Sequence, residues 1–350
     1  MSTKRISTTH ILLIGLFTII VFSALGWAQP KDVKPIYPDP EEWKSPTANK
    51  KYVIGACVPM MGAPYWRNLA YGVFSQAEKL GVELLFYDAG GYKFLEKQVK
   101  QVEDLIERKV DAIVICPCSS KGTVEVLERA ISKGIPVVNT VSWTYSDKIQ
   151  GAVLDDDYNI GKLQAEHIDK KYNGKAEGVM LCGPAGSDWS MNRVKGFKDY
   201  IADKPDMKVL GEKWSEPNIE VAQKIMDDFL QTFPDMKFCY TAADGMSMGA
   251  ANAVRAARKL GQVVITTASF SPEGADYLKK GWTSLNIGES PILEGAWALD
   301  VAVKILNGEE YPRLVYVPNP PFTKENMDDP EFSKYIKYQW APKGWRVPTF

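Results

Sequence analysis

Several aromatic and acidic residues stand shortly after apolar runs in the first half of the chain. These residues are Tyr65, Trp66, Asp88, Tyr92 and Trp143. The faces of aromatic rings attract alkylated ammonium groups by about 0.5–2 kcal/mol per ring, and they also stack on the apolar face of a sugar. The pattern therefore predicts exposed loop side chains at the edge of a small-molecule site, against the alternative that some of these rings simply pack in a core.

Side chains in the second half of the chain offer further contacts for such a ligand. Asp244 ends an apolar run and begins a helical pattern, so it either binds the ligand or caps that helix. Arg193 either contacts the ligand or pairs with a neighbouring carboxylate. Trp189 lies in the loop before a helix, and the alternative is that this loop is a simple turn. Glu289 lies near an expected hinge, and the alternative is that its carboxylate is simply solvated.

The chain lacks the usual inventory of an enzyme. It has two histidines, and His167 sits in the middle of a helical pattern with no nucleophile in view. Gly90-Gly91 follows an apolar run, but the full GxGxxG fingerprint and the P-loop lysine are absent. Asp156 and Asp157 are suited to acid–base work, yet nothing else supports a reaction. We therefore expect a binding protein with no catalytic residues, no metal site and no cofactor.

The elements that must position these side chains alternate regularly. Between residues 52 and 139, short apolar runs alternate with amphipathic helical patterns, such as 66–80 with Gly81 after it. Continuous apolar runs are typical of parallel strands that are covered by helices on both faces. The alternation restarts after Asp157. We therefore predict an α/β protein of two doubly wound parallel-sheet lobes, with the ligand in the cleft at the carboxyl ends of their strands.

The first 28 residues have the three-part pattern of a secretory signal. Lys4 and Arg5 precede an apolar stretch, and small residues at Gly26 and Ala28 predict cleavage after Ala28. The stretch is shorter than the roughly 18–20 residues that span a bilayer, so a membrane anchor is the weaker alternative. We expect a periplasmic protein that does not insert directly into the membrane after cleavage.

Composition narrows the remaining possibilities. The chain beyond the signal is longer than one hydrophobic core usually carries, so two domains are expected. The formal net charge is −1, and no basic region suggests a nucleic-acid partner. The five cysteines lie in or beside apolar runs without metal-ligand spacing, which favours buried free thiols over a disulfide.

Five stretches resemble the ribose-type (type I) periplasmic binding proteins, in family order and over most of the chain. They are 105–115, 130–138, 156–161, 192–197 and 243–250. The resemblance implies that a three-strand hinge joins the lobes, and we place its crossings near Val153, Asn286 and Tyr311. The expected segments are an extended part at 29–50, a first lobe of 51–152 plus 287–310, and a second lobe with tail of 153–286 plus 311–350.

A closer resemblance is to the TorT-type periplasmic sensors of trimethylamine N-oxide (TMAO). It rests on residues 65–72, 88–101, Ser269-Phe270 and the tail 341–348. It places Phe270 with the aromatic residues above as a candidate ligand contact, and it implies that the protein reports ligand to a membrane sensor histidine kinase.

The alternative is a substrate-binding protein that hands a sugar or polyol to an ABC permease. Asp157, Arg193 and Asp244 favour it, because they match the sugar-receptor pattern and are candidate contacts of the small-molecule ligand. Asp155-Asp156-Asp157 and Ser271 also stand where the sensor pattern has aromatic residues.

Overall fold

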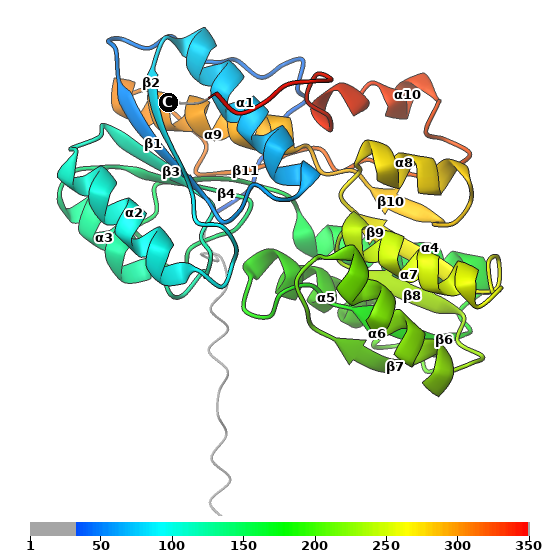
Figure 1. Cartoon of the computed structure of the whole chain (residues 1–350). Coiled ribbons are helices and arrows are strands. Elements are labelled where there is room, and N and C mark those ends of the chain that lie inside the picture. The colour runs from blue at the N-terminus through cyan, green and yellow to red at the C-terminus, as the bar shows by residue number, and fades with distance from the viewer. Residues whose placement is uncertain (1–32, 349–350) are drawn as a thin grey trace, which may run out of the picture.

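The computed structural model describes residues 33–348, which form two α/β lobes joined by three chain crossings (Figure 1). The predicted signal segment 1–28 and its cleavage point lie outside the described residues. Within residues 33–348, no helix is long and apolar enough to cross a membrane. The predicted fold class, two doubly wound parallel-sheet lobes, is confirmed.

The first lobe is a six-stranded parallel sheet with helices on both faces. Its strands lie in the order β11-β5-β4-β3-β1-β2. They are β1 (Val53–Val58), β2 (Glu83–Asp88), β3 (Ala112–Ile115), β4 (Val137–Thr140), β5 (Gly151–Leu154) and β11 (Leu314–Tyr316). Helices α1 (Pro64–Leu80) and α9 (Pro291–Asn307) cover one face, and α2 (Leu95–Glu107) and α3 (Val124–Ser132) cover the other. Both faces are therefore buried, which explains the continuous apolar runs.

The second lobe repeats this plan. Its strands lie in the order β12-β10-β9-β8-β6-β7, and only β12 pairs in the antiparallel sense among the described strands. They are β6 (Ala176–Leu181), β7 (Met207–Lys213), β8 (Phe238–Thr241), β9 (Val264–Ala268), β10 (Leu285–Ile287) and β12 (Pro321–Phe322). Helices α4 (Asp157–Tyr172) and α5 (Asp188–Ile201) pack together, as do α6 (Ile219–Thr232) and α7 (Asp244–Ala256), and α8 (Pro272–Lys279) packs beside α7.

The chain passes between the lobes after β5, after β10 and after β11. The third crossing does not lie near Tyr311, and that expectation is wrong. Leu314–Tyr316 pairs in parallel with Ala152–Leu154, so the chain extends the first sheet before it crosses. The whole of β5 also belongs to the first sheet, which moves the first lobe boundary past residue 152.

Asn319 ties the three crossings together. Its side-chain oxygen accepts a hydrogen bond from the backbone N of Asp156 at 3.1 Å. Its amide nitrogen donates to the Asp155 carboxylate and to the carbonyl oxygen of Gly288. One side chain from the third crossing therefore holds the backbone or side chains of the other two.

Glycines allow the helices next to the hinge to approach each other closely. A Cβ at Gly72 of α1 would lie 2.1 Å from the carbonyl oxygen of Ile292 in α9. A Cβ at Gly161 of α4 would lie 1.8 Å from the carbonyl oxygen of Arg193 in α5. No other residue type fits such an approach. These contacts fix the positions of α1 and α5, which both carry candidate site residues.

The C-terminal segment, which includes α10 (Pro330–Ser333), contacts both lobes rather than the second lobe alone (Figure 1). Trp340 stacks on Phe270 of the second lobe with ring centroids 5.7 Å apart. Trp345 meets Tyr71 of α1 edge-on at 5.4 Å. Between them, the backbone N of Ala341 donates to the side chain of Asn68. The tail is therefore a link between the lobes beside the hinge.

All five cysteines are buried with free thiols, in agreement with the preferred expectation. Burial, together with the nearby carboxylates of Asp88 and Glu216, raises the pKa of Cys118 to about 12. Neutral thiols are poor nucleophiles and metal ligands, so these cysteines act as small core residues.

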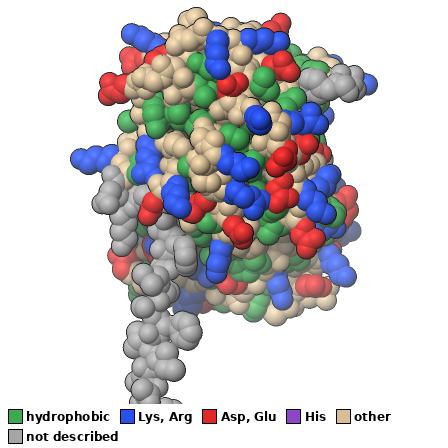
Figure 2. Space-filling model, turned by 90° about the vertical axis from the view of Figure 1, so that its left-hand side faces the viewer, with side chains coloured by type: hydrophobic (Ala, Val, Ile, Leu, Met, Phe, Trp, Pro, Cys, Tyr) green, Lys and Arg blue, Asp and Glu red, His purple; other side chains and the backbone are tan. Residues whose placement is uncertain are grey.

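The surface at the left of Figure 1, which includes α2 and α3, carries both signs of charge. Lys and Arg side chains alternate with Asp and Glu side chains on this face (Figure 2). An exposed ion pair of 2.6 Å between Arg129 of α3 and Glu103 of α2 is one example. Pairs of this kind contribute little to stability.

Candidate functional site

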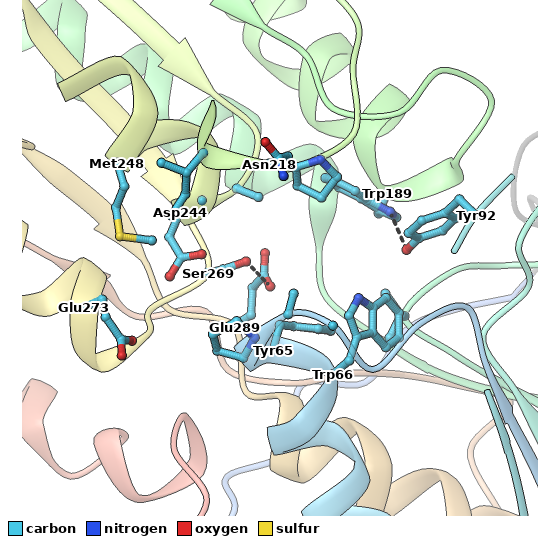
Figure 3. Close-up of a pocket in the computed structure, with 18 of the residues that line it drawn as sticks. Tyr65, Trp66, Tyr92, Trp189, Asn218, Asp244, Met248, Ser269, Glu273 and Glu289 are labelled. Atoms are coloured by element: carbon cyan, nitrogen blue, oxygen red, sulfur yellow. Dashed lines mark hydrogen bonds between the residues drawn. The ribbon is translucent and has the colours of Figure 1, made fainter. Parts of the chain in front are cut away.

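A cavity of about 390 Å³ lies between the lobes. The first lobe supplies the start of α1 and the loop after β2, and the second supplies the starts of α5, α6 and α7 and the crossing after β10 (Figure 3). Ligands of doubly wound proteins bind at this end of the strands. The volume falls in the range of small-molecule sites, roughly 300–1,000 Å³.

Three rings of the first lobe and one of the second form a connected wall of this cavity. Tyr65 and Trp66 meet edge-to-face with centroids 5.2 Å apart, and Trp66 meets Tyr92 at 6.1 Å. Trp189 reaches across from the second lobe, and its Nε1 donates to the hydroxyl of Tyr92 at 3.1 Å (Figure 3). Because this hydrogen bond joins the two lobes, the structure is a closed form of the protein.

Local sequence explains why these rings face the cleft. Pro64 occupies the first turn of α1, where its fixed φ and missing N–H suit a helix start. The next two residues, Tyr65 and Trp66, therefore fall at the end of the helix that points to the other lobe (Figure 3). Gly90 has a φ of 96°, which glycine adopts easily, and the resulting turn carries Tyr92 to the cavity.

Arg193 lines the cavity and is only 3% exposed. Its Nε pairs with Asp157 Oδ1 at 2.7 Å, and its Nη1 pairs with Glu289. The same Nη1 donates to the carbonyl oxygen of Ala242 at 2.8 Å. The guanidinium also lies 4.9 Å from the ring centre of Trp189. The expected pairing with a neighbouring carboxylate is therefore present, and Arg193 lines the cavity as well.

Asp244 is the first residue of α7 and lines the cavity. The N-cap residue of α7 is Ala243, and the Asp244 carboxylate accepts a hydrogen bond from the backbone of Gly245 in the first turn of that helix. Its Oδ2 also accepts a hydrogen bond from the backbone N of Ser271 at 3.0 Å, at the start of α8. Burial raises the pKa of Asp244 to about 6. The carboxylate is therefore mostly ionised at pH 7.

Four buried carboxyl groups gather where the crossings meet the cavity: Asp155, Asp157, Glu289 and Glu294. Arg193 pairs with two of them, and the hydroxyl of Tyr65 donates to Glu294. Burial raises the pKa of Asp155, Asp157 and Glu294 well above the usual range, and neighbouring carboxylates raise each further. The guanidinium of Arg193 is therefore outnumbered by these four buried carboxyl groups.

Most predicted site residues are brought together. Those that line the cavity are Tyr65, Trp66, Tyr92, Trp189, Arg193, Asp244 and Glu289. They come from five separated parts of the sequence, and the fold places them around one space. Their contact with a ligand stays a prediction.

Trp143 does not lie in an exposed loop, and that expectation is wrong. Its side chain is 0% exposed and packs in the core between the first sheet and α2 and α3. The loop after β4 turns at Val141, whose φ is 66°, and leads the ring away from the cleft. The guanidinium of Arg313 lies 5.9 Å from the ring centre, and neither residue is among those that line the cavity.

Three other predicted residues lie outside the cavity lining. Asp88 ends β2, where its Oδ1 accepts from the backbone N of Gly90 at 2.7 Å and shapes the turn that carries Tyr92. Asp157 lies behind Arg193. Phe270 stacks on Phe322 of β12 with centroids 4.2 Å apart, and it also stacks on Trp340 of the tail.

Sequence reasoning missed several lining residues, among them Asn218, Met248, Ser269 and Glu273. Met248 stands four residues after Asp244 on α7, so helical spacing would have found it. Ser269 donates to Glu289 Oε2 at 2.8 Å (Figure 3). Asn218 caps α6 by accepting from the backbone N of Val221, and an N-cap pattern was the signal for it.

Among residues 33–348, no group of three or more His, Cys, Asp or Glu side chains is arranged to hold a metal ion. The single described histidine, His167, contacts Ser284 Oγ at 2.7 Å outside the cavity lining. The chemistry that this arrangement offers is recognition, through ring faces, carboxylates and one guanidinium.

Comparison with known proteins agrees with this architecture. A family model described as a periplasmic binding protein domain matches residues 54–310. The ribose import binding protein RbsB of Bacillus subtilis (strain 168) is 27% identical over 283 residues, which cover 80% of this chain and 91% of that protein. A crystal structure of an ABC transporter periplasmic solute binding protein from Actinobacillus succinogenes 130z with bound D-allose has a TM-score of 0.75 and 25% identity, and it covers 80% of this chain and 100% of that one.

A second relative matches a longer part of the chain. The periplasmic protein TorT of Escherichia coli (strain K12) is 24% identical over 345 residues, which cover 97% of this chain and 96% of that protein. This match therefore extends into the segments before residue 54 and after residue 310, which the family model leaves out.

Proposed function

This chain belongs to the periplasmic binding protein family, and we propose that it is an exported receptor whose lobes close around a small molecule in the cavity described above. One observation carries the proposal. The wall of the cavity is complete only when Trp189 of the second lobe meets Tyr92 of the first. A ligand that contacts both lobes favours this closed form, because it has more partners there than in an open form.

Within that function, we propose a TorT-type receptor that binds TMAO or a related small ligand and signals to a membrane sensor histidine kinase. The match to TorT along 97% of the chain supports it, since it includes the tail that touches both lobes. The four rings of the cavity wall suit methyl groups on a positively polarised nitrogen. Arg193 supplies a cationic donor for an oxide oxygen.

A sugar or polyol receptor of an ABC transporter is the second candidate. It is supported by Arg193 and Asp244, which line the cavity and can exchange hydrogen bonds with hydroxyl groups. The relatives named for ribose import and the D-allose complex support it as well. The two candidate functions share a fold, so only the identity of the bound ligand distinguishes them.

Calorimetric titration tests the proposal. Residues 29–350, which begin after the proposed cleavage point, are titrated with TMAO, ribose and xylitol. Heat with TMAO and none with the other two compounds supports the sensor. Heat with ribose or xylitol alone replaces it with the transporter candidate. Genes beside this one separate the partners, because a sensor kinase accompanies the first candidate and a permease with an ATPase accompanies the second.

A further inference from the structure

The charges around the cavity are unbalanced. Arg193 is the one basic side chain among the described lining residues. Its Nε and Nη1 are already engaged by Asp157, Glu289 and a carbonyl oxygen. The lining residues also include four acids: Glu220, Asp244, Glu273 and Glu289.

The acids differ in their depth. Glu220 and Glu273 are exposed at the rim, where water screens them. Glu289 is buried, and Asp244 is half-buried and faces the cavity (Figure 3). Asp155, Asp157 and Glu294, the other buried carboxyl groups where the crossings meet the cavity, are not among the lining residues. The inner part of the cavity therefore has a net negative charge, even where some of the hinge carboxyls hold a proton.

This imbalance selects among classes of ligand. An anion would be repelled, because charges interact strongly in an enclosed site of low dielectric. A neutral polyol would satisfy hydrogen bonds but would leave the negative charge uncompensated when the lobes close over it. A cation would compensate that charge, and its alkyl groups would rest on the faces of Tyr65 and Trp66.

The cavity also has room for more than TMAO. Its volume of about 390 Å³ is that of sites for ligands well above the size of TMAO. Met248 and Val141 add apolar surface to the lining, beyond the four rings. The space thus fits a bulky hydrocarbon portion beside the charged group.

We propose that the ligand is an organic cation larger than TMAO, with an alkylated ammonium group held between the rings of Tyr65 and Trp66 and the carboxylates of Asp244 and Glu289. This inference rests on the proposed function, because it requires that the cavity between the lobes is the ligand site. It makes Asp244 a specificity-determining residue, since its carboxylate faces the ammonium group.

Two probes of the same shape isolate the charge. Choline and 3,3-dimethylbutan-1-ol differ only in the replacement of the cationic nitrogen by a neutral carbon. In calorimetric titrations of residues 29–350, choline is expected to bind at least about tenfold more tightly than the neutral alcohol, a difference typical of one good charge contact. TMAO and ribose are titrated in parallel.

Asp244→Asn tests the residue. The variant is expected to weaken choline binding about tenfold and to leave the neutral alcohol unchanged. Asp228→Asn, which makes the same change on the exposed face of α6, is expected to leave both unchanged. Thermal unfolding of each variant checks that the fold is retained.

The outcomes separate this inference from the proposed function. If TMAO binds and choline does not, the sensor stands and the cationic ligand is rejected. Equal affinity for choline and the alcohol also rejects it, as does an Asp244→Asn variant that weakens both equally. Binding heat with ribose alone rejects both the inference and the proposed TMAO sensor. No binding heat with choline at millimolar concentration rejects the inference.

Discussion

The two lobes place equivalent strands in the same order, and each sets a glycine-spaced pair of helices beside the hinge. They nevertheless offer the cavity different chemistry. The first lobe contributes the rings of Tyr65, Trp66 and Tyr92, whereas the second contributes Arg193 and Asp244 together with a single ring. Neither half is a complete site, so a ligand that needs both ring faces and charges must bring the lobes together.

The aromatic side and the charged side of the cavity should also differ in how much they contribute to the stability of the fold. The rings of the first lobe pack against the hydrophobic core. The charged side of the cavity instead contains the buried ion pair of Arg193 and Asp157, and buried carboxyl groups outnumber the one arginine there. Buried charges are tolerated when they are paired, and removal of one partner is costly. Substitutions on the charged side should therefore affect folding, while substitutions in the aromatic wall should affect mainly ligand binding.

The largest effect is expected on the charged side. Arg193→Met leaves Asp157 and Glu289 without their cation, and it should lower the free energy of unfolding by about 3–5 kcal/mol at neutral pH. Chemical denaturation measures it. Arg129→Met is the matched control, because it removes an exposed arginine paired with Glu103 and should cost less than about 1 kcal/mol. Similar losses in the two variants would show that the buried network does not stabilise the second lobe.

The aromatic wall is broken by Trp66→Ala. Loss of a central buried ring should weaken ligand binding by more than about 2 kcal/mol, while the fold is retained. Calorimetry with the ligand of the wild type measures the loss. Trp282→Ala, which removes a ring packed on Tyr277 outside the cavity lining, should leave affinity unchanged. Unchanged affinity in Trp66→Ala would place the site elsewhere.

The hinge acids predict a dependence on pH. Burial raises the pKa of Glu294 in the folded protein above the unfolded value of about 4.3. Ionisation of Glu294 therefore destabilises the folded protein at high pH, and this destabilisation disappears below the unfolded pKa, where the carboxyl is protonated in both states. Glu294→Gln should therefore be more stable than the wild type at pH 8, by on the order of 1–2 kcal/mol, and the gap should close towards pH 5. Thermal unfolding across this range measures it. A gap that widens as the pH falls would have the wrong sign.

The smallest effect concerns the contact between the lobes. Tyr92→Phe removes the hydroxyl that accepts from Trp189 Nε1, and it should weaken ligand binding by about 0.5–1.5 kcal/mol. Calorimetry measures this change as well. Tyr172→Phe removes a hydroxyl that donates to the backbone carbonyls of Lys237 and Gln262 in the second lobe; Tyr172 is not a lining residue, so affinity should be unchanged. Equal affinities in wild type and Tyr92→Phe would mean that closure does not depend on this bond.

The framework was predictable because it rests on local patterns. Continuous apolar runs and amphipathic helices identified both lobes, and strand ends located Tyr65, Trp66 and Tyr92. Asp244 was found for the same reason. These residues owe their places to chain direction within a parallel sheet, which sequence periodicity reports well.

The rest depended on long-range packing. The strand-end rule failed for Trp143, since the path of its loop is set by an unusual backbone at Val141. It also gave no hint that Phe270 would be covered by the tail, or that β11 would extend the first sheet before the last crossing. Such contacts join segments far apart in sequence, and no short pattern encodes them.

A crystal structure of residues 29–350 with whichever titrated compound binds most tightly would locate the ligand. We expect the ligand between the lobes, in contact with Trp66 of the first lobe and with Asp244 of the second. A ligand held by one lobe alone, or bound outside this cavity, would show that the cavity is not the ligand site.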